Sequence, residues 1–412
     1  MPNRGPHKSQ HTIEAHYFEK RLFTALTFIV LIFQAHLTEA AGEAIKPAGL
    51  GALDSVLVAG EKEEPLYAFK EKEPKVPAST LKILTALAAL RRLGESFRFK
   101  TAFYLDPAED LYVKGLGDPM LISEVIEEIS DQLPKHVKRI KDIILDEAFF
   151  EKGIRVPGSE RSTNPYDAPV GAICANFNTV FFKTGKNGRI ISAEPQTPIV
   201  NFSLKRIRES GLTQGRHSFM NDSGDASLYF GHLLAHFLKL RGVPVTGKII
   251  TGTAPSRQPI FVHTSTFTLK EVLQKMMEFS NNFIANQVAI TLGASIYGAP
   301  GTMEKAATAL SSFGKDELQL KSLRVLEGSG ISRENRISAA DMTKLLKAFE
   351  PYKSILKQRG DILYKSGTLR GIQARAGYIM RGVKEPVRFA VFLEKSKRNI
   401  DDIMDEIALR AH

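Results

Sequence analysis

The sequence has a single cysteine, Cys174, and no tryptophan among its 412 residues. One cysteine cannot form an intramolecular disulfide, so the fold must be stabilised by the size of its core. No set of cysteines and histidines has metal-ligand spacing, and no glycine-rich phosphate loop precedes a predicted helix. We therefore expect no zinc site and no nucleotide site, and we interpret Cys174 as a small buried apolar residue.

An arginine-rich tract with interleaved aromatic residues is also absent, although the net charge is +11. Scattered basic residues do not indicate nucleic-acid binding, and we expect no nucleic-acid partner. A basic protein suits an anionic partner such as a cell-wall polymer or a membrane surface. The composition, 43% hydrophobic and 25% charged, is typical of a globular chain and is sufficient for two or more lobes.

The N-terminal segment has the pattern of a secretory signal peptide. Lys20 and Arg21 precede the uncharged run LFTALTFIVLIF, which is followed by the small residues of QAHLTEAAGEA. A basic flank, an apolar middle and a small-residue end in this order predict a signal peptide over residues 1–41, cleaved near Ala40. The prediction places the mature protein in the periplasm or outside the cell. The alternative is an uncleaved membrane anchor, and peripheral association with the membrane or the wall is compatible with the basic charge.

Helices alternate with antiparallel strand patterns along the rest of the chain, which favours an α+β fold. Residues 98–254 differ in sequence pattern from the segments on either side, with short strand-like runs separated by turns. Residues 150–200 are rich in proline, glycine and asparagine. The economical interpretation is one domain formed by residues 42–97 and 255–412, with residues 98–254 inserted into it. Within the insert, Lys186-Asn187-Gly188 predicts the turn of a hairpin.

The segment PASTLKILTALAALRRLG, residues 77–94, predicts a helix that is apolar nearly all round and therefore buried. Ser79 and Lys82 are three residues apart and lie on one face of that helix. A hydroxyl beside a buried amine, whose pKa burial lowers, is the outline of an activated nucleophile. The alternative is an N-cap serine followed by a lysine whose ammonium reaches solvent.

Two later segments have chemistry that fits this pair. Ser280 and Asn282 have Ser-Xaa-Asn spacing within an apolar region that predicts a helix broken near Ser280. Lys365-Ser366-Gly367-Thr368 lies on a predicted strand, where the glycine lets a ligand approach the backbone.

The same spacings also occur elsewhere, so spacing alone does not identify a site. We interpret the other matches as surface or turn residues because they lie in polar contexts or out of order. They are Ser312/Lys315, Ser354/Lys357, Ser162/Asn164 and Lys183-Thr184-Gly185.

The three motifs, in this order, are the signature of penicillin-recognising serine enzymes. The context resembles the low-molecular-mass class C penicillin-binding proteins, the D-Ala-D-Ala carboxypeptidase/endopeptidase family. Six segments match in order from about residue 50 onward: PASTLKILTALAAL, KGLGDPML, YDAPVGAICANFNTV, SNNFIANQVA, EGSGISRENRIS and KSGTLRGIQARAGYI. The resemblance implies a β-lactamase-like transpeptidase domain, an antiparallel sheet flanked by helices, with an accessory domain inserted between the first two motifs.

The resemblance also implies the roles of the motif residues. Ser79 attacks the carbonyl carbon of a D-Ala residue in a peptidoglycan stem peptide, Lys82 accepts its proton, Ser280 relays a proton to the leaving amine, and Asn282 holds the lysine and the substrate. Lys365, Ser366 and Thr368 bind the terminal carboxylate, and the backbone N–H groups of Ser79 and Thr368 form the oxyanion hole. β-Lactams acylate the same serine, and no metal or organic cofactor is required. Arg370 lies where a substrate side chain is expected, either to bind its carboxylate or to remain solvated.

The sequence departs from the family pattern in three respects. Ser366 replaces the more frequent threonine, Glu327 replaces the aspartate of Asp-Gly-Ser-Gly, and the insert is shorter than is usual, which would open access for a polymeric substrate. Two alternatives are a non-catalytic wall-binding scaffold and a serine β-lactamase of the same fold. The complete set of motif hydroxyls and lysines argues against the scaffold. A β-lactamase is disfavoured because no glutamate-containing deacylation loop is visible.

Overall fold

The computed structural model describes residues 49–60, 62–380 and 386–410. The described residues all lie within one compact unit, Lys46–His412. The predicted signal peptide, residues 1–41, lies outside the described residues. Within them, no helix is both long enough and apolar enough to cross a bilayer.

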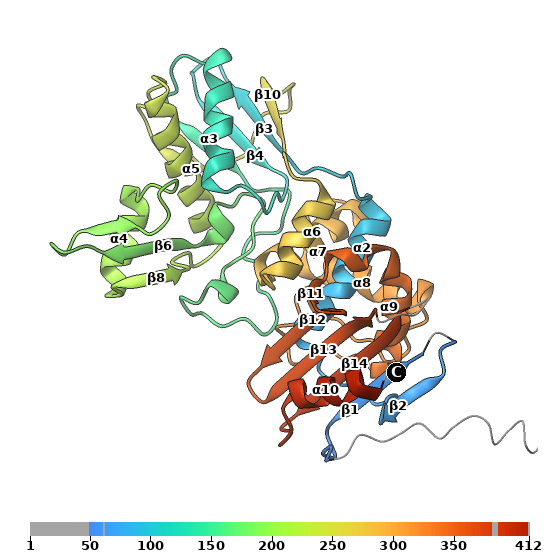
Figure 1. The fold of residues 1–412 in the computed structure, drawn as a ribbon. Helices are drawn as coiled ribbons and strands as arrows, with labels where there is room; N and C mark the ends of the chain where they lie inside the picture. The colour runs from blue at the N-terminus through green and yellow to red at the C-terminus, as the bar shows by residue number, and fades with distance from the viewer. Residues whose placement is uncertain (1–48, 61, 381–385, 411–412) are drawn as a thin grey trace, which may run out of the picture. The chain divides into compact units, whose positions relative to one another are not determined.

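A six-stranded antiparallel sheet brings the two ends of the described chain together (Figure 1). One of its antiparallel pairings joins Ser55 near the start to Phe392 near the end. The strand order is β11 (Lys357–Arg359), β12 (Ile362–Leu369), β13 (Ile372–Ile379), β14 (Val387–Glu394), β1 (Ser55–Ala59) and β2 (Pro65–Phe69). Strands from both flanking parts of the chain, 42–97 and 255–412, therefore form one sheet.

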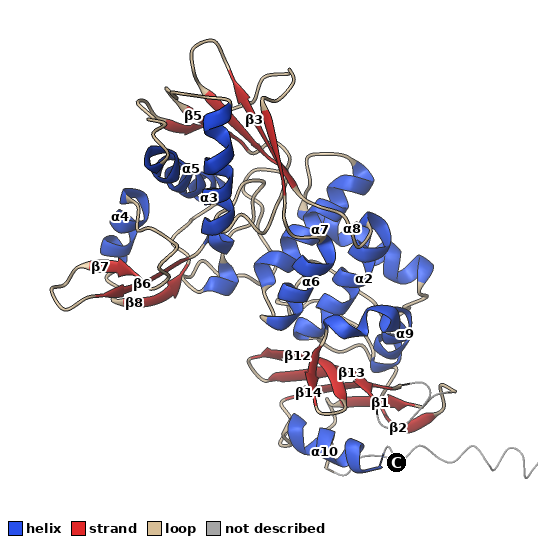
Figure 2. Cartoon of the chain, turned by 45° about the horizontal axis from the view of Figure 1, so that its top comes forward, coloured by secondary structure: helices blue, strands red, loops and turns tan. Residues whose placement is uncertain are grey.

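Helices cover both faces of this sheet, as Figure 2 shows. On one face, Val56 and Val58 of β1 pack with Ile403 and Met404 of α10 (Ile400–Arg410). On the other, Leu57 joins the main core, because successive residues of a strand face opposite sides. The helices on this side are α2 (Lys82–Leu93), α6 (Leu269–Glu278), α7 (Asn282–Tyr297), α8 (Met303–Ser312) and α9 (Ala339–Phe349). Sheet and helices together confirm the α+β fold class.

The predicted buried helix forms, but its first turn differs from expectation. Residues Ala78–Leu81 make a 3₁₀ turn, η1, and the α-helix α2 begins only at Lys82 and ends at Gly94. Ala78 has φ +46°, a left-handed conformation that cannot start an α-helix. Every residue of α2 from Lys82 to Leu90 is buried, since α2 packs against α6, α7 and α9. The apolar pattern therefore predicted burial correctly.

The middle of the chain forms two further sheets. The larger has the order β10 (Phe261–Thr264), β3 (Lys100–Leu105), β4 (Leu111–Gly115), β5 (Ile143–Asp146) and β9 (Ile249–Thr251). Helices α3 (Ser123–Gln132) and α5 (Ser223–Leu240) pack against each other, and α5 contacts this sheet. Because β10 pairs with β3, this sheet includes residues beyond 254, the predicted end of the insert. The domain boundaries at 98 and 254 remain a prediction.

The smaller sheet has the order β7 (Ile190–Ser192), β6 (Val180–Thr184) and β8 (Gln214–His217), and α4 (Asn201–Ser210) packs beside α5. The antiparallel β6–β7 pair confirms the hairpin predicted around Lys186-Asn187-Gly188. Gly188 has φ +71°, the conformation that this turn requires.

Candidate active site

Ser79 lies on η1, between strand β12 and the loop of residues 327–332. Both neighbours approach it at a glycine. A Cβ atom on Gly367 would lie 2.7 Å from the backbone nitrogen of Ser79, and one on Gly330 would lie 1.9 Å from the carbonyl oxygen of Ala78. The two glycines are therefore required for this close packing, which holds Ala78 in its left-handed conformation and sets the position of Ser79.

Lys82, one turn further on, is fully buried, and its ammonium group does not reach solvent. Its Nζ lies at hydrogen-bonding distance, 3.0 Å, from Ser79 Oγ, and it donates to Asn282 Oδ1 at 2.7 Å and to the carbonyl oxygen of Ser329 at 2.8 Å. Nor does the Ser79 side chain cap the helix. The alternative of an N-cap serine with a solvent-exposed lysine is thus wrong.

The surroundings of Lys82 favour the neutral amine. Burial lowers its pKa well below the ordinary value, and the positive charge of Lys365 lowers it further, while Glu327 opposes the shift. A neutral amine has two N–H donors and one lone pair. Asn282 Oδ1 and the Ser329 carbonyl can only accept, whereas the Ser79 hydroxyl can donate. The three partners therefore match a free amine whose lone pair faces the serine proton.

Ser280 and Lys365 form the second pair of the site. Lys365 on β12 is 3% exposed, and its Nζ donates to Ser280 Oγ at 2.8 Å and to the carbonyl oxygen of Ser366 at 2.7 Å. Burial, with a smaller effect of the charge on Lys357, lowers the pKa of Lys365 from 10.5 to about 8. Below that pH Lys365 is an ammonium ion with a hydroxyl partner, suited to binding an anion.

The predicted helix break at Ser280 is confirmed, and it explains how both motif side chains reach the site. Ser280 has φ +51° and separates α6 from α7. Asn281 caps α7, because its Oδ1 accepts from the backbone N–H of Ile284 at 3.0 Å. Asn282 is then the first residue of α7, directed at Lys82.

Glu327 belongs to the site, although sequence reasoning treated it only as a conservative replacement. Its fully buried carboxylate accepts five hydrogen bonds, and the acceptor distances are 2.6 Å from Ser329 N, 2.6 Å from Ser329 Oγ, 2.7 Å from Gly330 N, 3.3 Å from Ser332 N and 2.6 Å from Asn335 Nδ2. This folds the loop so that the Ser329 carbonyl faces Lys82, while the Gly328 carbonyl accepts from Thr85 Oγ1 at 2.6 Å. The sequence signal was the likeness of Glu-Gly-Ser-Gly, residues 327–330, to the Asp-Gly-Ser-Gly segment of the family.

The four predicted substrate-binding residues do not form one contact network. Gly367 is buried against Ser79, while Ser366, Thr368 and Arg370 are exposed. The carbonyl oxygen of Arg370 accepts a 2.6 Å hydrogen bond from Arg333. Arg370 follows the last residue of β12, on the turn to β13. Lys183-Thr184-Gly185, the competing match to the third motif, lies at the end of β6 in the three-stranded sheet.

The described residues contain no group of three or more His, Cys, Asp or Glu side chains arranged to hold a metal ion. Cys174 is buried and donates to the carbonyl oxygen of Asp118 at 3.0 Å, and burial raises its pKa well above the ordinary value. Cys174 is therefore a neutral core thiol, as the sequence predicted.

Comparison with protein families places the site in context. A model of the D-Ala-D-Ala carboxypeptidase 3 (S13) family matches residues 43–222 and 213–363. A D-alanyl-D-alanine carboxypeptidase from an Actinomadura species is 25% identical over 354 residues, which is 73% of this chain and 65% of that protein. The D-alanyl-D-alanine carboxypeptidase DacB of Haemophilus influenzae is 23% identical over 383 residues, 77% of this chain and 80% of that protein. The chain thus spans slightly less than two thirds of the Actinomadura relative.

Solved structures with the same fold support this placement. Penicillin binding protein 4 from Haemophilus influenzae has a TM-score of 0.70 at 20% identity and covers 88% of this chain and 97% of its own. A predatory peptidoglycan endopeptidase from Bdellovibrio bacteriovorus matches with a TM-score of 0.50 at 16% identity. This match covers 87% of the present chain and 90% of the endopeptidase. The fold is therefore that of the penicillin-binding proteins.

Proposed function

The chain belongs to the D-Ala-D-Ala carboxypeptidase 3 family, and from this premise we propose that it is a serine DD-peptidase. It hydrolyses D-Ala-D-Ala bonds, D-Ala-meso-diaminopimelate bonds, or both, in the stem peptides of peptidoglycan. The observation that carries the proposal is the fully buried Lys82, whose Nζ lies 3.0 Å from Ser79 Oγ and whose pKa is lowered. Such a pair is a nucleophile with its base in place.

Acylation begins when Ser79 Oγ attacks the carbonyl carbon of the penultimate D-Ala. Lys82 accepts the hydroxyl proton, since its lone pair faces Ser79 while its two N–H groups remain bonded to Asn282 and Ser329. The resulting ammonium keeps these two acceptors. Asn282 and the loop held by Glu327 therefore position the base before and after proton transfer.

The developing oxyanion is bound by backbone N–H groups. We assign these to Ser79 and Thr368, because β12 packs directly on the Ser79 nitrogen at Gly367. One donor of this kind typically contributes about 3–4 kcal/mol of transition-state stabilisation. Substitution of Gly367 would separate the two donors, so the glycine is part of the proposed machinery.

Ser280 and Lys365 act on the leaving side. Lys365 Nζ lies 2.8 Å from Ser280 Oγ, so the hydroxyl of Ser280 can pass a proton to the leaving amine. The ammonium of Lys365, with the hydroxyls of Ser366 and Thr368, binds the carboxylate of the terminal D-Ala. The C–N bond breaks, the amine departs with the proton that Ser280 relays from the Lys82 ammonium, and Lys82 is again a free amine. Water then attacks the ester with Lys82 as base, and the proton returns to Ser79 Oγ as the acid leaves. A β-lactam acylates Ser79 by the same attack, and its ring nitrogen takes the proton.

The substrate places the activity outside the cytoplasm. We propose a periplasmic or secreted protein with the signal peptide predicted over residues 1–41, and peripheral association with the wall or membrane through its basic charge. N-terminal sequencing of the exported protein would test the cleavage: a start near residue 41 is expected, and an intact N-terminus would favour the anchor.

Covalent labelling with a fluorescent penicillin tests the nucleophile. Label on the wild-type chain should disappear in Ser79→Ala and remain in Ser312→Ala and Ser354→Ala. Label that persists in Ser79→Ala would refute the assignment of Ser79.

Incubation with intact cross-linked peptidoglycan distinguishes the activities. Released monomeric muropeptides indicate endopeptidase action, and free D-Ala alone indicates carboxypeptidase action. A chain that binds the wall and never cuts it would be a scaffold, and rapid turnover of penicillin would indicate a β-lactamase.

A further inference from the structure

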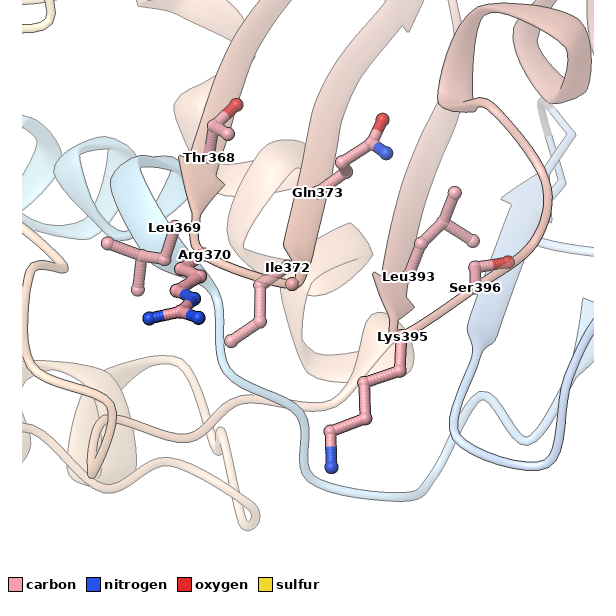
Figure 3. Close-up of a pocket in the computed structure, with 9 residues that line it drawn as sticks. Thr368, Leu369, Arg370, Ile372, Gln373, Leu393, Lys395 and Ser396 are labelled. Carbon is pink, nitrogen blue, oxygen red and sulfur yellow. The ribbon is translucent and has the colours of Figure 1, made fainter.

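A cavity of about 460 Å³ opens at the end of β12, beyond the proposed catalytic residues (Figure 3). It is formed by the β12–β13 turn and by the residues that follow β14. The residues that line it are Thr368, Leu369, Arg370, Gly371, Ile372, Gln373, Leu393, Lys395 and Ser396. Thr368 lines this cavity and also belongs to the proposed oxyanion hole, so the cavity begins one residue from Gly367, which packs on Ser79.

The cavity carries positive charge without a matching carboxylate. Arg370 and Lys395 are exposed, and among the described residues no hydrogen bond or ion pair joins either side chain to another group. The lining contains no aspartate or glutamate. Figure 3 shows the charged ends of Arg370 and Lys395 extending past the ends of their strands. Arg370 and Lys395, which line the same cavity on either side of Ile372, are unpaired cations and therefore suitable partners for a carboxylate.

Lys395 has an unfavourable backbone conformation. Its φ is +50°, a value that residues other than glycine rarely adopt. Two contacts stabilise it: its N–H donates to the carbonyl oxygen of Gly371 at 2.8 Å, and the next residue, Ser396, donates to the buried Asp54 at 2.8 Å. An unusual backbone conformation held by its surroundings often marks a functional position.

The direction of the substrate along β12 indicates which part of it reaches this cavity. In the proposed function the terminal carboxylate lies at Lys365 and the scissile carbonyl lies beside Gly367. The peptide on the amino side of the scissile bond must then continue past Thr368. An extended chain advances about 3.3 Å per residue along the strand, so the second residue before the penultimate D-Ala reaches the level of Leu369, next to Arg370.

We propose that this cavity binds a carboxylate carried by the second residue before the penultimate D-Ala, with Arg370 and Lys395 as its cationic partners. Lys395 is a specificity-determining residue that selects stem peptides whose carboxylate is free over those in which it is amidated. This inference rests on the proposed function for the direction of the bound peptide.

Binding to Ser79→Ala, which cannot be acylated, tests the inference by calorimetry. Two synthetic peptides ending in D-Ala-D-Ala are compared that differ only at the second residue before the penultimate D-Ala, a free carboxylate in one and its carboxamide in the other. We expect about tenfold tighter binding of the carboxylate peptide, the effect of one charge-assisted contact. Adding Lys395→Ala should abolish this preference, and Lys395→Arg should retain it.

Lys397→Ala is the matched control, because Lys397 is an exposed lysine of the same loop that does not line the cavity. It should leave the preference unchanged. Equal binding of the two peptides, or the same loss in Lys397→Ala as in Lys395→Ala, would overturn the inference. A third peptide with the carboxylate on the residue adjacent to the penultimate D-Ala should show no dependence on Lys395, and such a dependence would contradict the assigned position.

Activity of the chain with Ser79 intact separates this inference from the proposed function. If the two peptides bind with the expected preference but the chain releases neither D-Ala from them nor monomeric muropeptides from cross-linked peptidoglycan, the peptidase proposal fails and the carboxylate site stands. If both release D-Ala at equal kcat/KM and bind equally, the peptidase proposal stands and the carboxylate site fails.

Discussion

Lys82 Nζ donates a 2.7 Å hydrogen bond to Asn282 Oδ1, across 200 residues of sequence. The bond joins the first residue of α2 to the first residue of α7, and these two helices pack against each other in the core. It consumes one of the two N–H groups that a neutral amine offers, which helps to direct the lone pair at Ser79. The rigid pairing of two buried helices thus positions the proposed base.

Asn282→Asp should move the pH dependence of acylation upward. A carboxylate at this position faces Lys82 directly, and an opposite charge raises the pKa of an amine by about one unit or more. The free amine then forms only at higher pH, so the rising limb of the penicillin-acylation rate shifts to higher pH. Stopped-flow labelling across pH 5–10 measures this shift. Asn281→Asp is the control, since Asn281 caps α7 and aspartate caps equally well. An unshifted profile in Asn282→Asp would contradict the role of Lys82.

Gly367→Ala should slow acylation strongly while the protein remains folded. The added Cβ would lie 2.7 Å from Ser79 N and 2.9 Å from Ala78 Cβ, so β12 and η1 must separate. Displacement of one oxyanion donor reduces rates by about 10²–10³. Gly185→Ala, in the competing Lys183-Thr184-Gly185 segment, is the control, because its Cβ would make only ordinary contacts at 3.5 Å and 3.9 Å. Equal labelling rates in the two variants would contradict the role of Gly367 in positioning the oxyanion donors.

Glu327→Gln should destabilise the protein by about 2–4 kcal/mol, because an amide nitrogen would face N–H and O–H donors that now meet a carboxylate. Urea unfolding measures the loss. Glu327→Asp keeps the charge and the acceptors and should cost less. If Glu327→Gln is as stable as wild type, the carboxylate does not hold the loop in the way described.

Lys365→Met should change the pH dependence of stability. The folded protein lowers the pKa of Lys365 from 10.5 to about 8, so the unfolded chain binds the proton more tightly. The unfolding free energy therefore rises as the pH increases from about 8 to 10.5. Below pH 8 Lys365 is protonated in both states, and the folded wild type carries the full cost of burying its charge. Removal of the buried amine should stabilise the protein by on the order of 3 kcal/mol at pH 7, less the hydrogen bonds lost, and the gain should fade toward pH 10.5.

Urea denaturation of wild type and Lys365→Met at pH 7 and pH 10 compares the two conditions. Penicillin labelling of the variant should fall, because the proposed carboxylate site loses its charge. A stability difference that does not change between the two pH values would show that Lys365 is not perturbed in the folded protein.

Local signals in the sequence were sufficient for several elements. The apolar run from Leu81 to Leu90 predicted a buried helix, and the Lys186-Asn187-Gly188 turn predicted the β6–β7 hairpin. The sequence also predicted a helix break near Ser280, where the structure separates α6 from α7. These features depend on neighbouring residues alone, through periodicity, turn preference and capping, and so they are visible without tertiary contacts.

Other features could not be predicted because they depend on contacts between distant segments. The 3₁₀ turn at Ala78–Leu81 forms because the backbones of Gly330 and Gly367 pack closely against Ala78 and Ser79. The role of Glu327 depends on donors that its loop gathers only when folded. The pairing of β10 with β3 joins residues far apart in the chain, beyond the predicted boundary at 254.

The sequence by itself determined which residue types the site contains and their order, from Ser79 and Lys82 through Ser280 and Asn282 to Lys365. Spacing is a local property, and the order of motifs distinguished these residues from equally spaced matches elsewhere. Only the tertiary structure decided the state of Lys82. The apolar pattern predicted its burial, but its two acceptor-only partners, Asn282 Oδ1 and the Ser329 carbonyl, come from distant segments and are brought to it only by the fold, where burial and the charge of Lys365 lower its pKa.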